Sequence, residues 1–289
     1  GADEDGGAAG RALRLAREAG CLTIAFAPAG AEYELQPPAH DEYIRQELVE
    51  TLYHVLWELV HVFFEHRGLL AGRTERPTHD AGASSFLYPF LGEQERELEP
   101  VLADVRASVL MKADEIDALR TQTLRDNADA LATAAAALRR SFAAGGKLFA
   151  LGNGGSATDA MDAVVDLRAG RGAHRPRAAL DLTEDPAILT AIANDIGTEA
   201  IFSRQVIAYG SRGDSVLAFS TSGNSHSVID ALREARRHQL ISVAMVGYDG
   251  GRVAAEGLAD HVVVTRSEHI PRIQEAQASA WHVLRELVG

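Results

Sequence analysis

The sequence predicts an α/β protein whose principal domain is a doubly wound parallel sheet. After residue 145, short apolar runs rich in Val, Leu, Ile and Ala alternate with helix-like stretches. This alternation is typical of parallel strands that helices cover on both faces. In addition, a hydroxyl-rich turn follows two of the runs. The five runs are KLFALG, AALDL, SVLAFS, ISVAMVG and HVVVT.

The region before this domain begins with a predicted helix over residues 11–19 and a predicted buried strand over residues 21–27. Residues 41–66 place apolar side chains on a wide stripe, which predicts one long helix. Residues 67–93 are rich in Gly, Pro, Thr and Ser, which favours a linker.

Residues 94–144 again have a helical pattern. Pro100 is expected to start or kink a helix, because proline has no backbone N–H to donate. Gly145 and Gly146 supply the stop signal of the last helix in this region. The helices expected between and after the strands span residues 156–169, 186–193, 199–209, 226–238 and 271–288.

An internal repeat relates the two ends of the chain. Residues 12–27 resemble residues 231–246, and residues 46–59 resemble residues 274–287. The two segments also follow one another in the same order, and in a similar relative placement, at both ends of the chain. The alternative explanation is chance similarity between amphipathic helices.

If the repeat is real, residues 1–66 form a degenerate half repeat of the domain at residues 94–289. In each copy a glutamine precedes a histidine by eight residues, so both side chains face the same side of a helix. The pairs are Gln46 with His54 and Gln274 with His282. In the degenerate copy this pair is interpreted as structural.

The charge and composition of the chain exclude some classes of function. The formal net charge of −13 argues against broad contact with nucleic acid or with an anionic membrane. The sequence has no apolar run of the length that a membrane span needs and no signal-peptide pattern at its start, so a cytoplasmic protein is expected. The single cysteine, Cys21, lies in the run CLTIAFA and is predicted to be a buried small hydrophobe.

The two hydroxyl-rich turns predict an anion site. GNGGSATDA (152–160) and FSTSGNS (219–225) each follow a strand and lead into a helix, whose first N–H groups carry partial positive charge. Ligands of doubly wound sheets bind at this edge. Serine and threonine hydroxyls there add neutral donors, so a phosphate is the expected ligand. The alternative is helix capping by the serines without a ligand.

These stretches, together with AIANDIGTEAIFSR, GYDGG and RIQEAQASAWH, resemble the sugar isomerase (SIS) domain in its phosphoheptose isomerase branch. The resemblance covers residues from about 112 to 289. It implies a five-stranded parallel sheet and homo-oligomers, dimeric or tetrameric, with sites at subunit interfaces. It also implies the reaction of the family, which converts sedoheptulose 7-phosphate to D-glycero-D-manno-heptose 7-phosphate through an enediol.

The resemblance also implies roles for individual residues. His282 matches the acid–base histidine and Gln274 a metal-site glutamine that also lies near the substrate. The sugar is expected near Asn153, Gly154 and Asp195. The expected phosphate ligands are Ser156, Ser220, Thr221, Ser222 and Ser225.

Two positions depart from the family pattern, which has a His and, four residues later, a Glu. Here they are Asp162 and Asp166. Their spacing places both on one helical face, so Asp162, Asp166, Gln274 and His282 are candidate ligands of a divalent metal. Zinc is implied by the family, whereas the carboxylate oxygens suit Mg²⁺ or Mn²⁺. Alternatively, the two aspartates form a solvated helix face and His282 is a core histidine.

Two functional hypotheses follow. The first is a phosphosugar isomerase in which Asp166 is the base and His282 the acid–base partner. The second is a sugar-phosphate-binding SIS protein without catalysis that serves regulation or assembly, as some relatives with this fold do.

Overall fold

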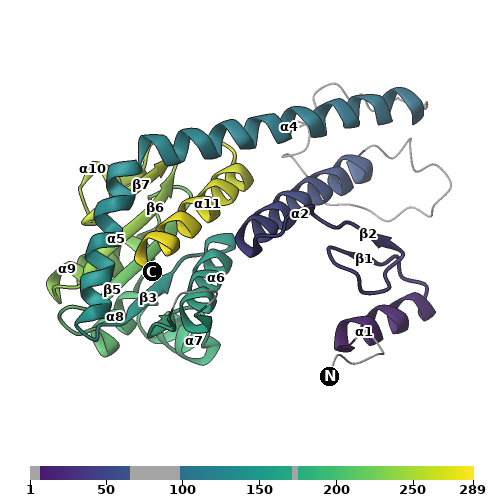
Figure 1. Ribbon diagram of the computed structural model, residues 1–289. Coiled ribbons are helices and arrows are strands. Elements are labelled where there is room, and N and C mark those ends of the chain that lie inside the picture. Colours follow the sequence, from purple (N-terminus) through teal and green to yellow (C-terminus); the bar gives the residue numbers. More distant parts are fainter. Residues whose placement is uncertain (1–6, 66–97, 171–174) are drawn as a thin grey trace. The chain divides into compact units, whose positions relative to one another are not determined.

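The structure is a computed structural model that describes residues 7–65, 98–170 and 175–289 (Figure 1). The chain divides into two compact units, Gly1–Leu102 and Ala103–Gly289. The linker predicted at residues 67–93 lies outside the described residues. No helix in the described ranges is long and apolar enough to cross a membrane.

The second unit contains a five-stranded sheet whose strands all run parallel, in the order β4-β3-β5-β6-β7. Each strand falls on one of the apolar runs, so the predicted doubly wound fold is confirmed. The strands are β3 (Leu148–Leu151), β4 (Ala179–Asp181), β5 (Ser215–Ser220), β6 (Ile241–Gly247) and β7 (His261–Thr265).

Helices cover both faces of this sheet (Figure 1). Successive residues of β3 and β5 belong alternately to two buried apolar clusters, because side chains alternate between the faces of a strand. One cluster also takes side chains from α5, α6 and α11, and the other from α8, α9 and α10. These helices are α5 (Ala128–Ala143), α6 (Gly155–Ala169), α8 (Ser203–Tyr209), α9 (His226–Arg237), α10 (Gly251–Ala255) and α11 (Ile270–Val288).

Local sequence signals explain where several helices begin. Helix α4 (Leu98–Asp126) has Pro100 in its first turn, where a missing N–H costs no hydrogen bond. Helix α7 (Pro186–Asp195) starts at a proline, and the Asp185 carboxylate accepts hydrogen bonds from the first turn. The 3₁₀ turn at Thr198–Ala200 precedes α8, so the single helix predicted for residues 199–209 is two elements.

Strand order places the two hydroxyl-rich turns together. Strands β3 and β5 are neighbours, but the chain leaves β3 for one side of the sheet and β5 for the other. Helix α6 accordingly contributes to one apolar cluster and α9 to the other. This is the switch point at which doubly wound sheets bind their ligands.

The first unit consists of α1 (Gly7–Glu18), β1 (Ile24–Ala25), β2 (Tyr33–Glu34) and α2 (Glu42–Glu65). The long helix was predicted within one residue at each end. The buried strand predicted over residues 21–27 is wrong, because only two residues are strand and neither is buried. Cys21 is exposed rather than buried. Two strands without further neighbours cannot enclose this segment as the five-stranded sheet encloses β6.

Candidate active site

The turn at the carboxyl end of β5 is closely fitted to its surroundings. Gly223 has a φ of +62°, and a Cβ there would lie 2.2 Å from the backbone oxygen of Gly250. The Ser220 hydroxyl accepts a hydrogen bond from the backbone N–H of Gly223 at 3.2 Å, and Ser222 accepts one from Asn224 at 3.2 Å. A hydroxyl that accepts a backbone N–H keeps its own hydrogen for donation. Both serines are therefore set to donate to an anion.

Asn153 joins this turn to the turn after β3. Its side-chain Nδ2 donates to the hydroxyl oxygen of Ser225 at 2.7 Å and to that of Ser227 at 2.9 Å. Ser156 is buried in the first turn of α6, and Thr221 is half-buried. The two predicted halves of the anion site thus meet through one amide.

The helices that follow the turns begin without side-chain caps. Ser225 occupies the capping position of α9, yet within the described part of the chain its side chain makes no capping hydrogen bond. Gly154, which starts α6 with a φ of +59°, has no side chain to contribute. The capping alternative is therefore wrong for Ser225. The first N–H groups of α9 keep the partial positive charge that favours an anion.

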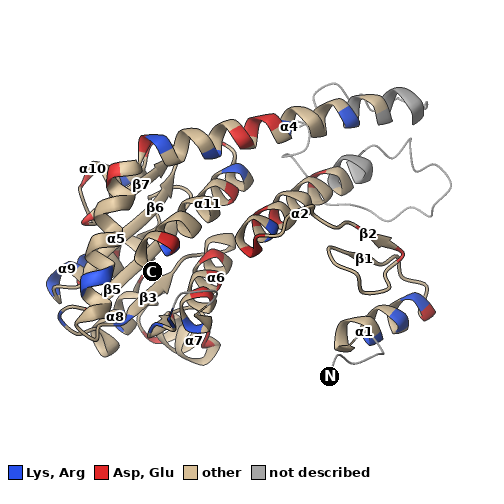
Figure 2. Cartoon of the chain, viewed as in Figure 1, with Lys and Arg blue, Asp and Glu red and all other residues tan. Residues whose placement is uncertain are grey.

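Helix α6 carries the acidic side of the site, visible as a run of acidic positions in Figure 2. Asp166 is only 1% exposed, and its Oδ2 accepts a hydrogen bond from the indole Nε1 of Trp281 at 3.1 Å. Asp162 is exposed. The two carboxylates, although four residues apart, therefore lie in different surroundings. Their spacing still places both on one side of α6, but the alternative of a solvated helix face is wrong for Asp166, which is buried.

Helix α11 brings Gln274 and His282 toward α6, and both residues are buried. A Cβ on Gly155 would lie 2.0 Å from Nε2 of Gln274, so the amide packs directly on the start of α6. The Gln274 side chain also hydrogen-bonds Asp159. The eight-residue spacing thus places both predicted residues on the buried side of one helix.

Asp159 belongs to the site although the sequence analysis did not select it. Burial raises the pKa of its carboxyl to about 8, the negative charge of Asp162 adds to the rise, and the hydrogen bond from Gln274 opposes it. Asp159 is therefore mostly protonated at neutral pH and can donate a hydrogen bond. Its position three residues before Asp162 is the signal that could have identified it.

Asp195 lies apart from these contacts. It is the exposed last residue of α7, where its Oδ1 accepts a hydrogen bond from Nδ2 of Asn194 at 2.7 Å. Within residues 98–170 and 175–289, its hydrogen bond is to this neighbour and not to the other predicted site residues. Its proximity to the sugar remains a prediction.

The predicted metal ligands do not form a metal site in this structure. Among the described residues, no three His, Cys, Asp or Glu side chains are grouped so that they could hold a metal ion. Asp162 is exposed, Asp166 accepts the Trp281 N–H, and Gln274 packs on Gly155. The donor set therefore does not fit the ion that the family resemblance implies, and no step of the reaction is assigned to one.

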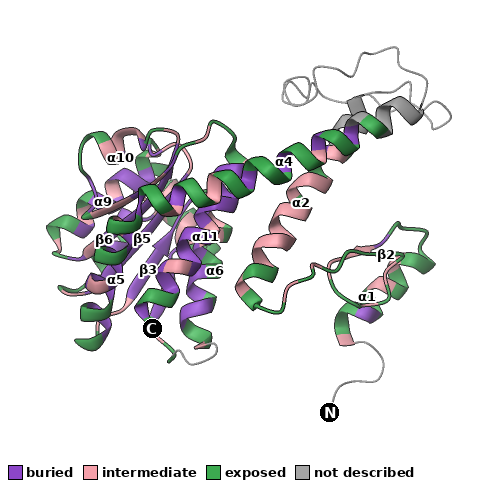
Figure 3. Cartoon of the chain, turned by 45° about the horizontal axis from the view of Figure 1, so that its top comes forward, coloured by how far each residue is buried: buried purple, intermediate pink, exposed green. Residues whose placement is uncertain are grey.

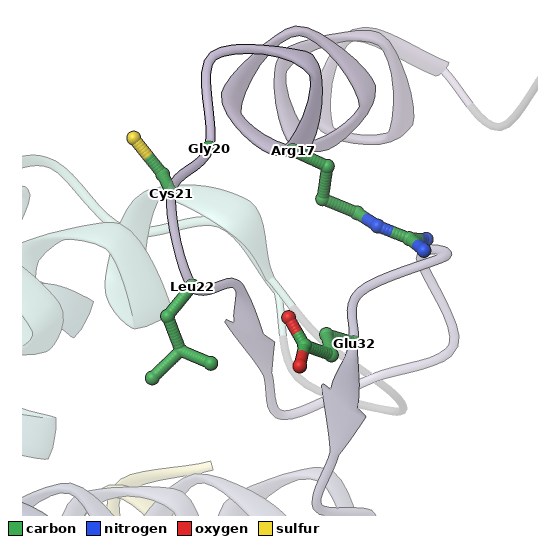
Figure 4. A pocket seen from close by; sticks show the side chains of 5 residues that line it. All are labelled: Arg17, Gly20, Cys21, Leu22 and Glu32. Carbon is green, nitrogen blue, oxygen red and sulfur yellow. The ribbon is translucent and has the colours of Figure 1, made fainter.

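A pocket of about 340 Å³ lies in the first unit, lined by Arg17, Gly20, Cys21, Leu22 and Glu32 (Figure 4). None of these residues belongs to the predicted site. The Cys21 thiol turns away from Arg17 and Glu32 in this view. Nη1 of Arg17 donates to the backbone oxygen of Gly30 at 3.3 Å. The pocket is therefore not the candidate active site.

Comparison with known proteins identifies the second unit. The profile of the SIS domain family matches residues 113–247. The phosphoheptose isomerase of Chlorobium phaeobacteroides is 42% identical over 174 residues, which are 59% of this chain and 76% of that protein. The chain belongs to the SIS family, in its phosphoheptose isomerase branch. The resemblance read from the sequence is therefore confirmed.

Further relatives agree with this assignment. The phosphoheptose isomerase of Nitratidesulfovibrio vulgaris is 38% identical to this SIS protein over 185 residues, 64% of this chain and 88% of that protein. The structure of phosphoheptose isomerase GmhA from Neisseria gonorrhoeae superposes with a TM-score of 0.59 at 31% identity, over 64% of this chain and 98% of that one. The SIS fold thus accounts for about two-thirds of the chain.

Proposed function

We propose that this SIS protein is a phosphosugar isomerase that interconverts sedoheptulose 7-phosphate and D-glycero-D-manno-heptose 7-phosphate. Membership in the phosphoheptose isomerase branch supports the reaction class. The observation that carries the proposal is the hydroxyl-rich turn after β5, which has an uncapped helix behind it and is joined by Asn153 to the turn after β3. A phosphate is the ligand that such a turn fits best.

In this proposal the substrate lies with its phosphate on the β5 turn and its carbonyl end toward α6 and α11. Ser220, Thr221, Ser222 and Ser225 donate their hydroxyl hydrogens to the phosphate oxygens. The backbone N–H groups at the start of α9 add their partial positive charge. Because the donors are neutral, they bind the anion without the strong desolvation cost of a buried lysine.

The chemistry needs two proton movements. Asp166 takes the proton from C1 of the ketose, the electron pair forms the C1–C2 double bond of the enediol, and the carbonyl oxygen at C2 accepts a proton. The same proton is then returned to C2, and the hydroxyl at C1 gives up its proton as the aldehyde forms. His282 moves the protons between the oxygens. Protonated Asp159 donates a hydrogen bond that stabilises the negative charge on the enediol oxygens.

A direct assay of sedoheptulose 7-phosphate turnover tests this proposal. The wild-type protein should form the aldose phosphate, and His282→Ala should reduce kcat by about 10²- to 10⁴-fold, the usual contribution of a general acid–base group. Absence of product at every metal condition, or undiminished turnover in His282→Ala, would refute it.

A second candidate is a sugar-phosphate-binding protein without catalysis. The observation that favours it is the departure at Asp162 and Asp166, together with the lack of a convergent metal-ligand group among the described residues. This candidate predicts calorimetric binding of sedoheptulose 7-phosphate that Ser222→Ala weakens, with no isomerisation. Detectable product from pure protein decides against it.

We also propose that the protein is a homo-oligomer, dimeric or tetrameric, and cytoplasmic. Helix α6 exposes Met161 (45%) and Val165 (46%) beside Asp162. Two large apolar side chains one turn apart are suited to packing against another subunit. Light scattering tests this proposal. A monomer at micromolar concentration contradicts it. An unchanged oligomer in Met161→Glu/Val165→Glu would show that the subunits contact each other elsewhere than at this face of α6.

A further inference from the structure

We propose that Trp281 is a positioning residue that holds the Asp166 carboxylate through a hydrogen bond from its indole N–H. The inference rests on the proposed function in one respect, namely that Asp166 is the base. It goes beyond that function because it names the residue that holds the base.

The contact itself is direct. Nε1 of Trp281 donates to Oδ2 of Asp166 at 3.1 Å, and the two residues are 115 positions apart in the chain. Trp281 is 3% exposed and Asp166 1% exposed. The bond therefore joins the last turn of α6 to the second half of α11, away from competing water.

Both partners need this bond. Trp281 lies in the apolar cluster that includes Ala163, Leu167 and Ala280. An indole N–H in such surroundings costs free energy unless it finds an acceptor. A buried carboxylate needs donors for the same reason. Because Trp281 directly precedes His282, one turn of α11 positions both the proposed base and its acid–base partner.

The bond fixes the orientation of the carboxylate through one of its two oxygens. The indole N–H can only donate, and here it is directed at Oδ2 of Asp166. The family pattern has a Glu at this position, so the side chain of Asp166 is one methylene shorter. Trp281 thus holds the shorter carboxylate from the neighbouring helix.

Trp281→Phe isolates the N–H because it keeps a buried aromatic ring. We expect kcat to fall about 10- to 100-fold, the range expected for a lost hydrogen bond to a charged group, while KM changes less than about threefold. Phe142→Leu alters the same apolar cluster, and neither side chain has a donor that could bind the Asp166 carboxylate. As the stability control, it should lower the melting temperature without lowering kcat.

The split between kcat and KM is the readout that a purely structural role of Trp281 would not give. A loss of kcat in Trp281→Phe that Phe142→Leu matches at equal loss of stability would overturn the proposal, as would unchanged kcat in Trp281→Phe.

The hydrogen bond is also measurable without turnover. The chain has two tryptophans, so Trp57→Phe leaves Trp281 as the single indole in an NMR spectrum. Its N–H proton should resonate downfield and exchange slowly, and it should move upfield in Asp166→Leu. If these shifts appear without isomerisation, the proposed reaction fails and the positioning role stands. An indole resonance unaffected by Asp166→Leu overturns the positioning role whatever the activity.

Discussion

The two ends of the chain have the same succession of elements but different surroundings. Helix, strand, strand and helix follow one another in α1–β1–β2–α2 and again in α9–β6–β7–α11, where α10 is inserted between the strands. Both strand pairs are parallel. Ile24 pairs with Tyr33, and Val243 pairs with His261 at the corresponding place.

A hydrogen bond recurs beside these pairs. The Thr23 hydroxyl accepts from the backbone N–H of Glu32 at 2.9 Å, and the Ser242 hydroxyl accepts from that of Asp260 at 3.0 Å. In both regions the residue that accepts this bond comes just before the paired residue of the first strand. The residue that donates it comes just before the paired residue of the second strand. These correspondences support our proposal that residues 1–66 are a degenerate half repeat.

The difference between the regions lies in burial (Figure 3). Met245 is fully buried in β6, whereas Phe26, its counterpart in the repeat, is half-buried. Leu240 is 4% exposed, and its counterpart Cys21 is exposed. The local pattern of a strand is therefore not sufficient for burial. Neighbouring strands and helices on both faces make the core.

The regions also differ in what accepts the hydrogen bonds of a loop whose backbone N–H groups could bind an anion. In the first unit the Glu34 carboxylate accepts backbone N–H groups from Ala29, Gly30 and Ala31 at 3.0, 2.7 and 3.2 Å. These bonds lower the pKa of Glu34. The chain thus supplies its own anion there, whereas the hydroxyls of the turn after β5 are proposed to donate to a ligand.

The largest contrast is expected between the two histidines that follow a glutamine. His282→Ala should lower kcat by about 10²- to 10⁴-fold because it removes the acid–base group. The matched change in the first unit, His54→Ala, should leave kcat within about threefold. Steady-state kinetics measure both. Equal losses in the two variants would contradict the assignment of chemistry to the second unit alone.

The next largest effect is expected on phosphate binding, when a serine of the turn after β5 is compared with a serine of another loop. Ser222→Ala should raise KM about 10-fold or more through the loss of a hydrogen bond to a charged group. Stability should stay within about 0.5 kcal/mol, as expected for a substitution outside the core. Ser211→Ala, a change in an exposed loop, should leave KM unchanged. A KM that responds equally to both substitutions would place the phosphate elsewhere.

Core truncation tests the difference in burial. Met245→Ala should cost about 2–5 kcal/mol of unfolding free energy, because it leaves a cavity in a close-packed core. Phe26→Ala should cost less, since its side chain is half-exposed already. Urea denaturation measures both. A greater loss for Phe26→Ala would show that the first unit has the tighter core.

The carboxyls of Asp159 and Glu34 should make opposite contributions to the pH dependence of stability. The folded protein raises the pKa of Asp159 from 3.8 to about 8, so folding retains a proton that the unfolded chain loses. The contribution of Asp159 to stability is present below about pH 4 and is lost as the pH rises toward 8. Asp159→Asn should flatten this decline in thermal melts.

The contribution of Glu34 to stability changes with pH in the opposite direction. Its lowered pKa contributes stability above its ordinary value of 4.5, and this contribution is lost as the pH falls. The effect should be the smallest of the set, because Glu34 is exposed. Melting curves of Glu34→Gln between pH 3 and 7 should therefore converge on the wild type at low pH. A gap that widens on acidification would reverse the assignment.

Sequence reasoning recovered the five strands because each is an apolar run bounded by turn signals. It missed α10, which has five residues and begins in the glycine-rich stretch GYDGG. It overestimated the strand at residues 21–27, because CLTIAFA has the composition of a core strand without the neighbours that would bury it. Pattern therefore predicts elements better than it predicts their surroundings.

The candidate site also could be predicted only as far as local sequence patterns reach. The serines and Asn153 could be selected because motif and strand end coincide in sequence. Asp159 was missed although its spacing from Asp162 is visible in the sequence, since its raised pKa arises from burial and from the charge of Asp162. The bond between Trp281 and Asp166 spans 115 positions and depends on how α11 packs against α6. Contacts of this kind become visible only in the folded chain.

The most direct test of the account is a crystal structure of the protein soaked with sedoheptulose 7-phosphate. The account predicts phosphate density on the turn at residues 220–225, within hydrogen-bonding distance of the Ser220 and Ser222 hydroxyls and of the first N–H groups of α9. A fully occupied sugar phosphate bound elsewhere, with this turn empty, would contradict it.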